Sequence, residues 1–122
     1  MKGVYINNSW GSSNGKYGIY ADGVGRLKIQ NSAFIDNGFS SSGVYSGIRL
    51  HNCQDGIVLG NQCYDVSSKQ KYGVETTGTS NYNLIVANNC RGNINASADI
   101  VYVGNNNKVA WNLGRYTSQG SA

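Results

Sequence analysis

Several features that define common protein classes are missing from this sequence of 122 residues. No apolar run approaches the roughly 18–20 residues of a membrane-spanning helix, so the sequence excludes one. Three cysteines are too few, and odd in number, for a disulfide framework. Only 13% of the residues are charged and no block of like charge occurs, which argues against a basic nucleic-acid-binding arm. The net charge of +4 instead favours an anionic partner of another kind.

No secretory signal is recognised at the start, because Met1-Lys2-Gly3 leads directly into an expected strand. We therefore expect either a cytosolic chain or a piece of a longer exported or virion protein. The second interpretation is favoured, so the expected location is extracellular or virion-associated.

The composition that remains indicates short strands rather than disorder. Hydrophobic residues make up 39% of the chain, and the 17 glycines and repeated asparagines could suggest a chain without a core. Nine tyrosines and two tryptophans oppose that interpretation. Short β-branched runs bounded by Gly, Asn, Asp and Ser are typical of strands, and they occur at residues 4–6, 57–59, 84–86 and 100–103.

Two sequence elements recur with the same period. Residues 27–34, 57–64 and 84–91 share the pattern apolar, variable, apolar, small or polar, Asn. The asparagines at positions 8, 31, 61, 88 and 112 are separated by 23, 30, 27 and 24 residues. A second element occupies residues 18–21, 47–50, 73–76 and 99–102, with steps of 29, 26 and 26 between its leading apolar residues. The ordered leucines of a leucine-rich repeat are absent, and a propeller blade needs roughly 40 residues.

The period predicts an all-β, right-handed, single-stranded parallel β-helix of about four to five coils. We expect the coils to occupy residues 1–114 and a polar tail to occupy residues 115–122. Asn8, Asn31, Asn61 and Asn88 are predicted to form a ladder, since asparagine can bond from coil to coil and accepts tight bends. Cys63 and Cys90 share an inward position in adjacent coils and are expected to be buried free thiols.

Alternation of side chains predicts which residues face outward. In the second element, residues 19, 48, 74 and 100 face the interior, so their neighbours in sequence face the solvent. In the first element we expect Val58, Ile85 and Ala87 to form an exposed apolar stripe, which is typical of a partner surface.

The coils IVLGNQCYD, LIVANNCRGN and YGVETTGTSN, with the closing NNNKVAWN, resemble the pectate-lyase-like right-handed β-helix superfamily. They are most similar in character to Asn-rich coils of bacterial and phage tailspike or neck-appendage proteins. The resemblance covers Gly3 to Asn112 and implies a polysaccharide as ligand or substrate. It is specific for fold rather than for activity. The family's calcium-binding and catalytic acidic motifs are not recognisable here, so no cofactor or metal is expected.

One outward patch on three successive coils carries the residue types that uronic-acid chemistry needs. As catalytic candidates we select Arg49 to neutralise a sugar carboxylate, His51 to move a proton, and Glu75. The candidate ligand-binding residues lie beside them in the same patch or in the preceding loops: Tyr17, Tyr20, Asp22, Tyr45, Lys71 and Tyr72. The alternative is an ordinary surface, since Arg49 and Glu75 are expected to be neighbours of opposite charge.

The sequence therefore predicts a segment that binds or processes a polysaccharide, with an acidic glycan as the favoured partner. If it is an enzyme, we expect a lyase, a hydrolase or an epimerase. The alternative is a structural or assembly segment of a fibre or virion protein, favoured by apolar residues at the open ends of the stack. The expected partners are polysaccharide and further copies of the chain, through a homo-oligomer or stacked coil ends, but neither nucleic acid nor membrane.

Overall fold

The computed structural model describes residues 3–95 and 98–118, and strands are the only regular elements among them. Each strand has three or four residues, bounded by turns rich in Gly, Asn and Asp. The strands are β1 (Tyr5–Asn7), β2 (Ile19–Asp22), β3 (Lys28–Gln30), β4 (Ile48–His51), β5 (Ile57–Leu59), β6 (Val74–Thr77), β7 (Leu84–Val86), β8 (Ile100–Tyr102), β9 (Lys108–Ala110) and β10 (Tyr116–Ser118). In this part of the chain no helix could cross a membrane.

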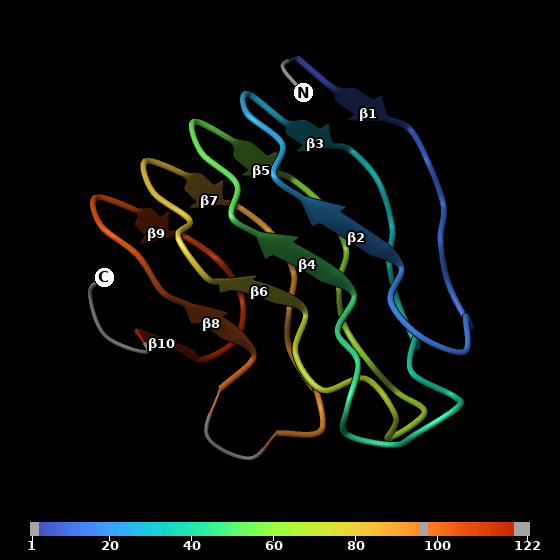
Figure 1. The fold of residues 1–122 in the computed structure, drawn as a ribbon. Coiled ribbons are helices and arrows are strands. Elements are labelled where there is room, and N and C mark those ends of the chain that lie inside the picture. Colours follow the sequence, from blue (N-terminus) through green and yellow to red (C-terminus); the bar gives the residue numbers. More distant parts are fainter. Residues whose placement is uncertain (1–2, 96–97, 119–122) are drawn as a thin grey trace.

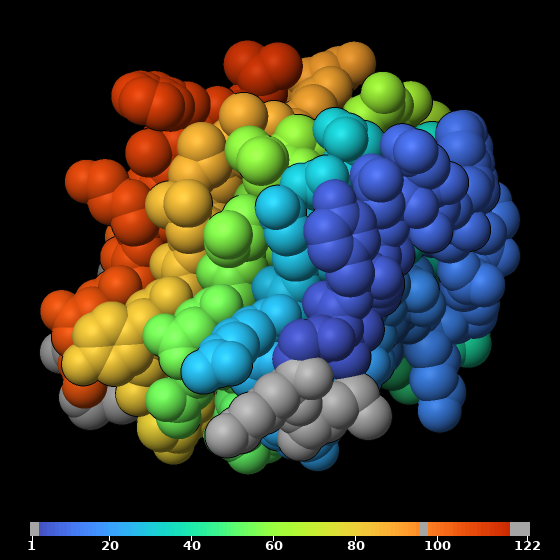
Figure 2. All heavy atoms as spheres, turned by 90° about the horizontal axis from the view of Figure 1, so that it is seen from above, coloured from blue at the N-terminus to red at the C-terminus, as the bar shows by residue number. Residues whose placement is uncertain are grey.

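The strands form two parallel sheets, and the chain visits them alternately (Figure 1). The first sheet has the order β1-β3-β5-β7-β9 and the second the order β10-β8-β6-β4-β2. A third column of isolated parallel bridges joins residues 10, 33, 62, 89 and 113. Successive coils stack directly on one another along the solenoid axis (Figure 2). The chain is therefore a right-handed parallel β-helix of about four turns, which confirms the predicted fold.

The interior is filled by apolar side chains from both sheets, and β4 contributes two of them. Fully buried side chains come from the first sheet (Ile29, Val58, Ile85), from the second sheet (Ile48, Leu50, Val74, Ile100) and from the positions after the bridges (Cys63, Cys90). All three cysteines are free and buried, as expected for Cys63 and Cys90. Because the coils stack in register, each core side chain packs on its equivalents above and below.

One step of the first sheet, from β3 to β5, differs by one residue from the predicted alignment, whereas β5 and β7 pair as predicted. Ile29 pairs with Val58, and Val58 pairs with Ile85. The predicted exposed stripe of Val58, Ile85 and Ala87 is therefore wrong, because Val58 and Ile85 point into the core. A shift of one residue moves every side chain of a strand to the other face. The apolar residues on the outer face, here called the first-sheet apolar strip, are Ile57, Leu59, Leu84 and Val86.

The bend after each first-sheet strand has a residue with positive φ, and this row contains Asn8 (φ 52°) and Asn31 (φ 51°). Asparagine tolerates this left-handed backbone better than most residues. The next row contains the hydrogen-bonded amides: Asn61 Nδ2 donates to Asn88 Oδ1 at 3.0 Å, and Asn88 Nδ2 donates to Asn112 Oδ1 at 3.0 Å. The ladder predicted through Asn8, Asn31, Asn61 and Asn88 is not confirmed in that form.

The first positions of this amide row belong to serines. The backbone N–H of Ser9 donates to Ser32 Oγ, and the N–H of Ser32 donates to Asn61 Oδ1, both at 3.0 Å. Another buried row follows the loops, where Asn37 Nδ2 donates to Gln70 Oε1 at 3.1 Å and Gln70 Nε2 donates to Asn93 Oδ1 at 2.8 Å. These rows satisfy polar groups that the interior would otherwise leave unpaired.

The segment expected as a polar tail contributes to the sheet. Tyr116–Ser118 forms β10, which pairs in parallel with β8. Arg115, directly before it, lies with Nε 3.1 Å from Oδ2 of the buried carboxylate of Asp99. The solenoid therefore continues to Ser118, and the rest of the expected tail lies outside the described residues.

Candidate ligand-binding face

The outer face of the second sheet carries the predicted site, and its register is as expected. Tyr20 on β2 pairs with Arg49 on β4, which pairs with Glu75 on β6. Two residues further along the same strands, Asp22 pairs with His51. In a parallel stack each of these residues lies about 4.8 Å from its equivalent on the next coil. Tyr20, Arg49 and Glu75, with Tyr17 and Tyr45 from the preceding loops, are called the tyrosine–arginine face below.

Arg49 is the centre of this face. Its Nη1 donates a hydrogen bond of 2.7 Å to the hydroxyl of Tyr17, and its guanidinium carbon lies 5.6 Å and 5.5 Å from the ring centroids of Tyr17 and Tyr20. Cation–π attraction at such distances fixes the guanidinium against the rings. Burial lowers the pKa of Arg49, but the hydrogen bond to Tyr17 and the charge of Glu75 outweigh it and raise the pKa overall. The group is a permanently charged and positioned cation.

Arg49 also retains unused hydrogen-bonding capacity. Its Nε is buried and has no partner among the described residues. A guanidinium carries five N–H donors, and an unpaired buried donor costs roughly 1–3 kcal/mol. The side chain is therefore held by stacking and by one strong hydrogen bond, and it still lacks a full set of acceptors.

Two tyrosine rings lie against the cation, and a third packs on one of them. The ring of Tyr17 lies 5.3 Å from that of Tyr20 and 5.0 Å from that of Tyr45, the second pair being edge-on at 88°. Tyr20 is 49% exposed, whereas Tyr17 and Tyr45 are half-buried. Lys16 Nζ lies 6.0 Å from the ring centroid of Tyr45. The face therefore presents the exposed ring of Tyr20, supported by the ring of Tyr17, beside the cations Arg49 and Lys16.

Glu75 is not a free carboxylate. It is 6% exposed, and its Oε1 accepts a hydrogen bond of 3.0 Å from Ser46 Oγ and lies 4.0 Å from Arg49 Nη1. Such a buried and occupied carboxylate is poorly placed to take a proton from a bound substrate. Ser46 was missed by the sequence analysis. It stands two residues before the first inward residue of its strand, as Tyr17 and Tyr72 do, and an alignment of that column could have found it.

Lys71 and Tyr72 lie directly before β6, on the coil that carries Glu75. Lys71 Nζ lies 5.0 Å from the ring centroid of Tyr72, whose hydroxyl accepts a hydrogen bond of 3.4 Å from Asn95 Nδ2. Burial, and to a smaller extent the negative charge of Glu75, raise the pKa of Tyr72. The phenol therefore stays neutral and can only donate or accept hydrogen bonds.

His51 and Asp22 form the far end of the patch. His51 Nδ1 is 2.8 Å from Thr77 Oγ1, and Asp22 is exposed beside it on β2. No hydrogen bond between described residues joins His51 to Arg49 or Glu75. The three predicted catalytic residues therefore share one face without forming a linked proton-transfer system.

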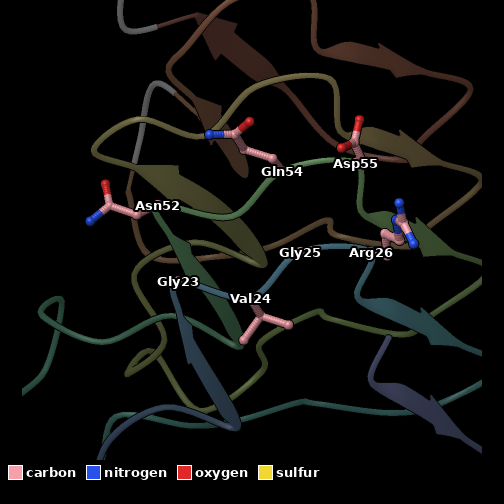
Figure 3. Close-up of a pocket in the computed structure, with 7 residues that line it drawn as sticks. All are labelled: Gly23, Val24, Gly25, Arg26, Asn52, Gln54 and Asp55. Carbon is pink, nitrogen blue, oxygen red and sulfur yellow. The ribbon is translucent and has the colours of Figure 1, made fainter. Parts of the chain in front are cut away.

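A hollow of about 420 Å³ begins where this far end stops. It lies at the turns that follow β2 and β4, and its lining includes Gly23 and Asn52, the residues directly after Asp22 and His51. Figure 3 shows Arg26 and Asp55 together at one end of the hollow and Asn52 at the other. Its walls are partly polar and partly apolar, with Val24 among them and no aromatic ring, so the hollow can bind polar groups but offers no stacking surface.

Among the described residues, no group of three or more His, Cys, Asp or Glu is arranged to hold a metal ion. Comparison with protein-family models, with curated proteins and with solved structures finds no match. The function must therefore be inferred from the geometry of the chain itself.

Proposed function

We propose that this chain binds an acidic polysaccharide through the tyrosine–arginine face. The observation that carries the proposal is the fixed guanidinium of Arg49 beside the exposed ring of Tyr20, 5.5 Å apart. A sugar that carries a carboxylate has an anionic group and an apolar ring face, and these two side chains match the two features. The net charge of +4 favours the approach of such a polyanion.

The positions of the cations support an extended rather than a compact ligand. Lys16 and Lys71 lie in loops that precede β2 and β6, on either side of the strand that carries Arg49. The three cations are thus distributed along the stack of coils, and a chain of charged sugars running along the stack would meet them in turn. The face has too few cations to follow a phosphate backbone, which makes nucleic acid the weaker candidate.

Binding suits this geometry better than catalysis. Glu75 is buried and occupied by Ser46 and Arg49, and His51 is directed to Thr77. A catalytic site would need a base within hydrogen-bonding reach of the substrate. A lyase or hydrolase activity that His51→Ala abolishes would contradict the binding role.

Tyr20→Ala tests the proposal, with Tyr5→Ala as a matched control. Tyr5 is 57% exposed on the outer face of the first sheet and also lies beside a cation, with Lys28 Nζ 5.4 Å from its ring centroid. In calorimetric titrations with uronate oligosaccharides at low salt, we expect Tyr20→Ala to weaken binding roughly tenfold and Tyr5→Ala to leave it unchanged. Binding should weaken as salt is raised past ~0.1 M, where the Debye length is about 10 Å.

Three results would contradict the proposal. The first is the absence of binding to any uronate polymer by the wild-type protein. The second is an equal loss of affinity in Tyr20→Ala and Tyr5→Ala, since the contact would then not involve the tyrosine–arginine face. The third is tighter binding of single-stranded RNA than of every uronate tested.

The first-sheet apolar strip favours assembly as a second candidate function. Leu59 and Leu84 are each 37% exposed and lie on the adjacent strands β5 and β7. Ile57 lies beside Leu84, and Val86 lies beside Leu59, on the same two strands. A contiguous apolar surface of this kind often marks contact with another protein. If assembly is the function, sedimentation equilibrium should show an oligomer that Leu84→Glu dissociates, and a monomeric wild-type protein would refute it.

A further inference from the structure

We infer that the chain has a second sugar-binding site, specific for uncharged sugars, in the hollow beside Trp10. The hollow has a volume of about 400 Å³ and lies at the corner between the first sheet and the third column, across the first three coils. Pockets that hold small molecules measure roughly 300–1,000 Å³. The site shares no residue with the tyrosine–arginine face and goes beyond the function proposed for it.

Trp10 supplies a stacking surface in this hollow. Its side chain is 72% exposed, and its indole Nε1–H donates a hydrogen bond of 2.6 Å to Ser12 Oγ. This bond satisfies the polar edge of the ring and restricts its orientation, so that an apolar face is available at small entropic cost. The electron-rich face of an indole ring attracts groups with partial positive charge, such as the C–H bonds on one side of a pyranose.

Small residues on the next two coils make room opposite the ring. Ala33 follows Trp10 in the bridge column, and Gly60 lies at the neighbouring bend with φ 66°. A Cβ atom on Gly60 would lie 3.5 Å from Asn31 Oδ1, inside the space that the two coils now leave open. Because Ala33 and Gly60 extend no large side chain here, the hollow continues below the tryptophan as far as Gln62.

The walls offer neutral hydrogen-bonding groups that are not already used. Among the described residues, the side-chain amides of Asn8 and Gln62 have no partner, and Asn31 Nδ2 has only a long contact of 3.5 Å to Asn7 Oδ1. A free amide can donate and accept at once, which matches neighbouring sugar hydroxyls.

No residue that lines this hollow is charged, in contrast to the tyrosine–arginine face. A carboxylate would lose water here without gaining a counter-charge, which is costly. The lining therefore selects an uncharged hexose unit over a uronate. An apolar ligand is disfavoured as well, because it would leave the amides unpaired.

Tryptophan fluorescence can report on this site alone. The sequence has two tryptophans, so Trp111→Phe leaves Trp10 as the single tryptophan, and excitation at the red edge of tryptophan absorption avoids the nine tyrosines. Trp111 is 85% exposed at the opposite end of the stack, which makes the replacement mild. Titration of this variant with neutral gluco-, manno- and galacto-oligosaccharides should give a saturable change in Trp10 emission with at least one series.

Calorimetry on two further variants tests the same contact without fluorescence. Trp10→Ala should weaken binding of that neutral oligosaccharide at least tenfold, and Gln62→Ala should weaken it several-fold, because stacking and amide contacts are lost respectively. Tyr20→Ala should leave it unchanged. Conversely, Trp10→Ala should leave binding of uronates unchanged, so failure of this inference is separable from failure of the acidic-glycan proposal.

Two outcomes would overturn the inference. One is that no neutral oligosaccharide changes the emission of Trp10 or releases heat on mixing. The other is that a neutral oligosaccharide binds but Trp10→Ala binds it as well as the wild-type protein does. If Tyr20→Ala then abolishes that binding, the neutral sugar occupies the tyrosine–arginine face instead.

Discussion

Replacement of Asn88 by alanine is expected to destabilise the solenoid severely. The side chain is 2% exposed, and its Nδ2 lies within 3.1 Å of three acceptors, the carbonyl oxygens of Val58 and Val86 and the Oδ1 of Asn112. Its Oδ1 accepts hydrogen bonds from the backbone N–H of Asn61 at 2.9 Å and from Asn61 Nδ2 at 3.0 Å. One amide thus connects three successive coils.

The size of the loss follows from the groups that remain unpaired. In Asn88→Ala two donors of Asn61 lose their acceptor, and Asn61 is itself only 1% exposed. Each buried donor left without a partner costs roughly 1–3 kcal/mol, so the free energy of unfolding should fall by about 2–6 kcal/mol. Since a whole domain is stable by only about 5–15 kcal/mol, this is a large part of the total.

Urea denaturation followed by circular dichroism measures this change. Asn89→Ala is the matched control, because Asn89 is half-buried and its side chain accepts only a long contact of 3.5 Å from the N–H of Arg91. We expect the control to lose less than about 1 kcal/mol. Asn88→Leu, which keeps the volume but not the hydrogen bonds, should remain destabilised. The reasoning is refuted if Asn88→Ala and Asn89→Ala lose the same stability, or if Asn88→Leu restores it.

Further replacements test other parts of the structure by the same denaturation assay. Ile85→Ala, at a fully buried site, should lower the free energy of unfolding by about 2–5 kcal/mol, whereas Leu84→Ala on the outer face should cost clearly less; equal losses would contradict the register. The hydrogen bond with the neighbouring thiol, and then burial, raise the pKa of Cys90 well above 9.0. The stability contributed by this protonated thiol is therefore present below about pH 9 and lost as the pH rises further, so the difference between wild type and Cys90→Ala should shrink above about pH 9; a constant difference would contradict this. Asp99→Ala removes the carboxylate that accepts hydrogen bonds from Arg115, and we expect it to lower the free energy of unfolding by about 3–5 kcal/mol. A loss under about 1 kcal/mol would show that β10 does not depend on this carboxylate.

The sequence predicted the second sheet better than the first, and the reason is visible in individual strands. In β2, Ile19-Tyr20-Ala21-Asp22 alternates between apolar and polar residues, and the aligned strands pair in the predicted register. In the first sheet, residues 57–59 and 84–86 are apolar at every position. Such strands have no polar face that identifies the inward residues. The predicted alignment of residues 27–34 with residues 57–64 was therefore wrong by one residue.

The amide rows show a related limit. Asparagines recur at both the bend position and the next one, and sequence alone cannot separate an asparagine that adopts positive φ from one that bonds between coils. The structure assigns Asn31 to the bend and Asn61 to the hydrogen-bonded row. The register of the structure fixes this difference, since Gln30 pairs with Leu59 and Ala33 pairs with Gln62.

The sequence by itself determined the solenoid, because a period of apolar pairs in the twenties repeats along the chain and only stacked coils can bury it. It also placed Tyr20, Arg49 and Glu75 on one face, since the strands that carry them alternate regularly. The tertiary structure decided what these side chains do. Loops of unequal length bring Tyr17 and Ser46 to Arg49 and Glu75, and the repeat places these residues in one column without showing which hydrogen bonds they form. The hollow beside Trp10 was not predicted either, because it depends on the pairing of Ala33 with Gln62 in the third column, which the sequence alignment missed by one residue.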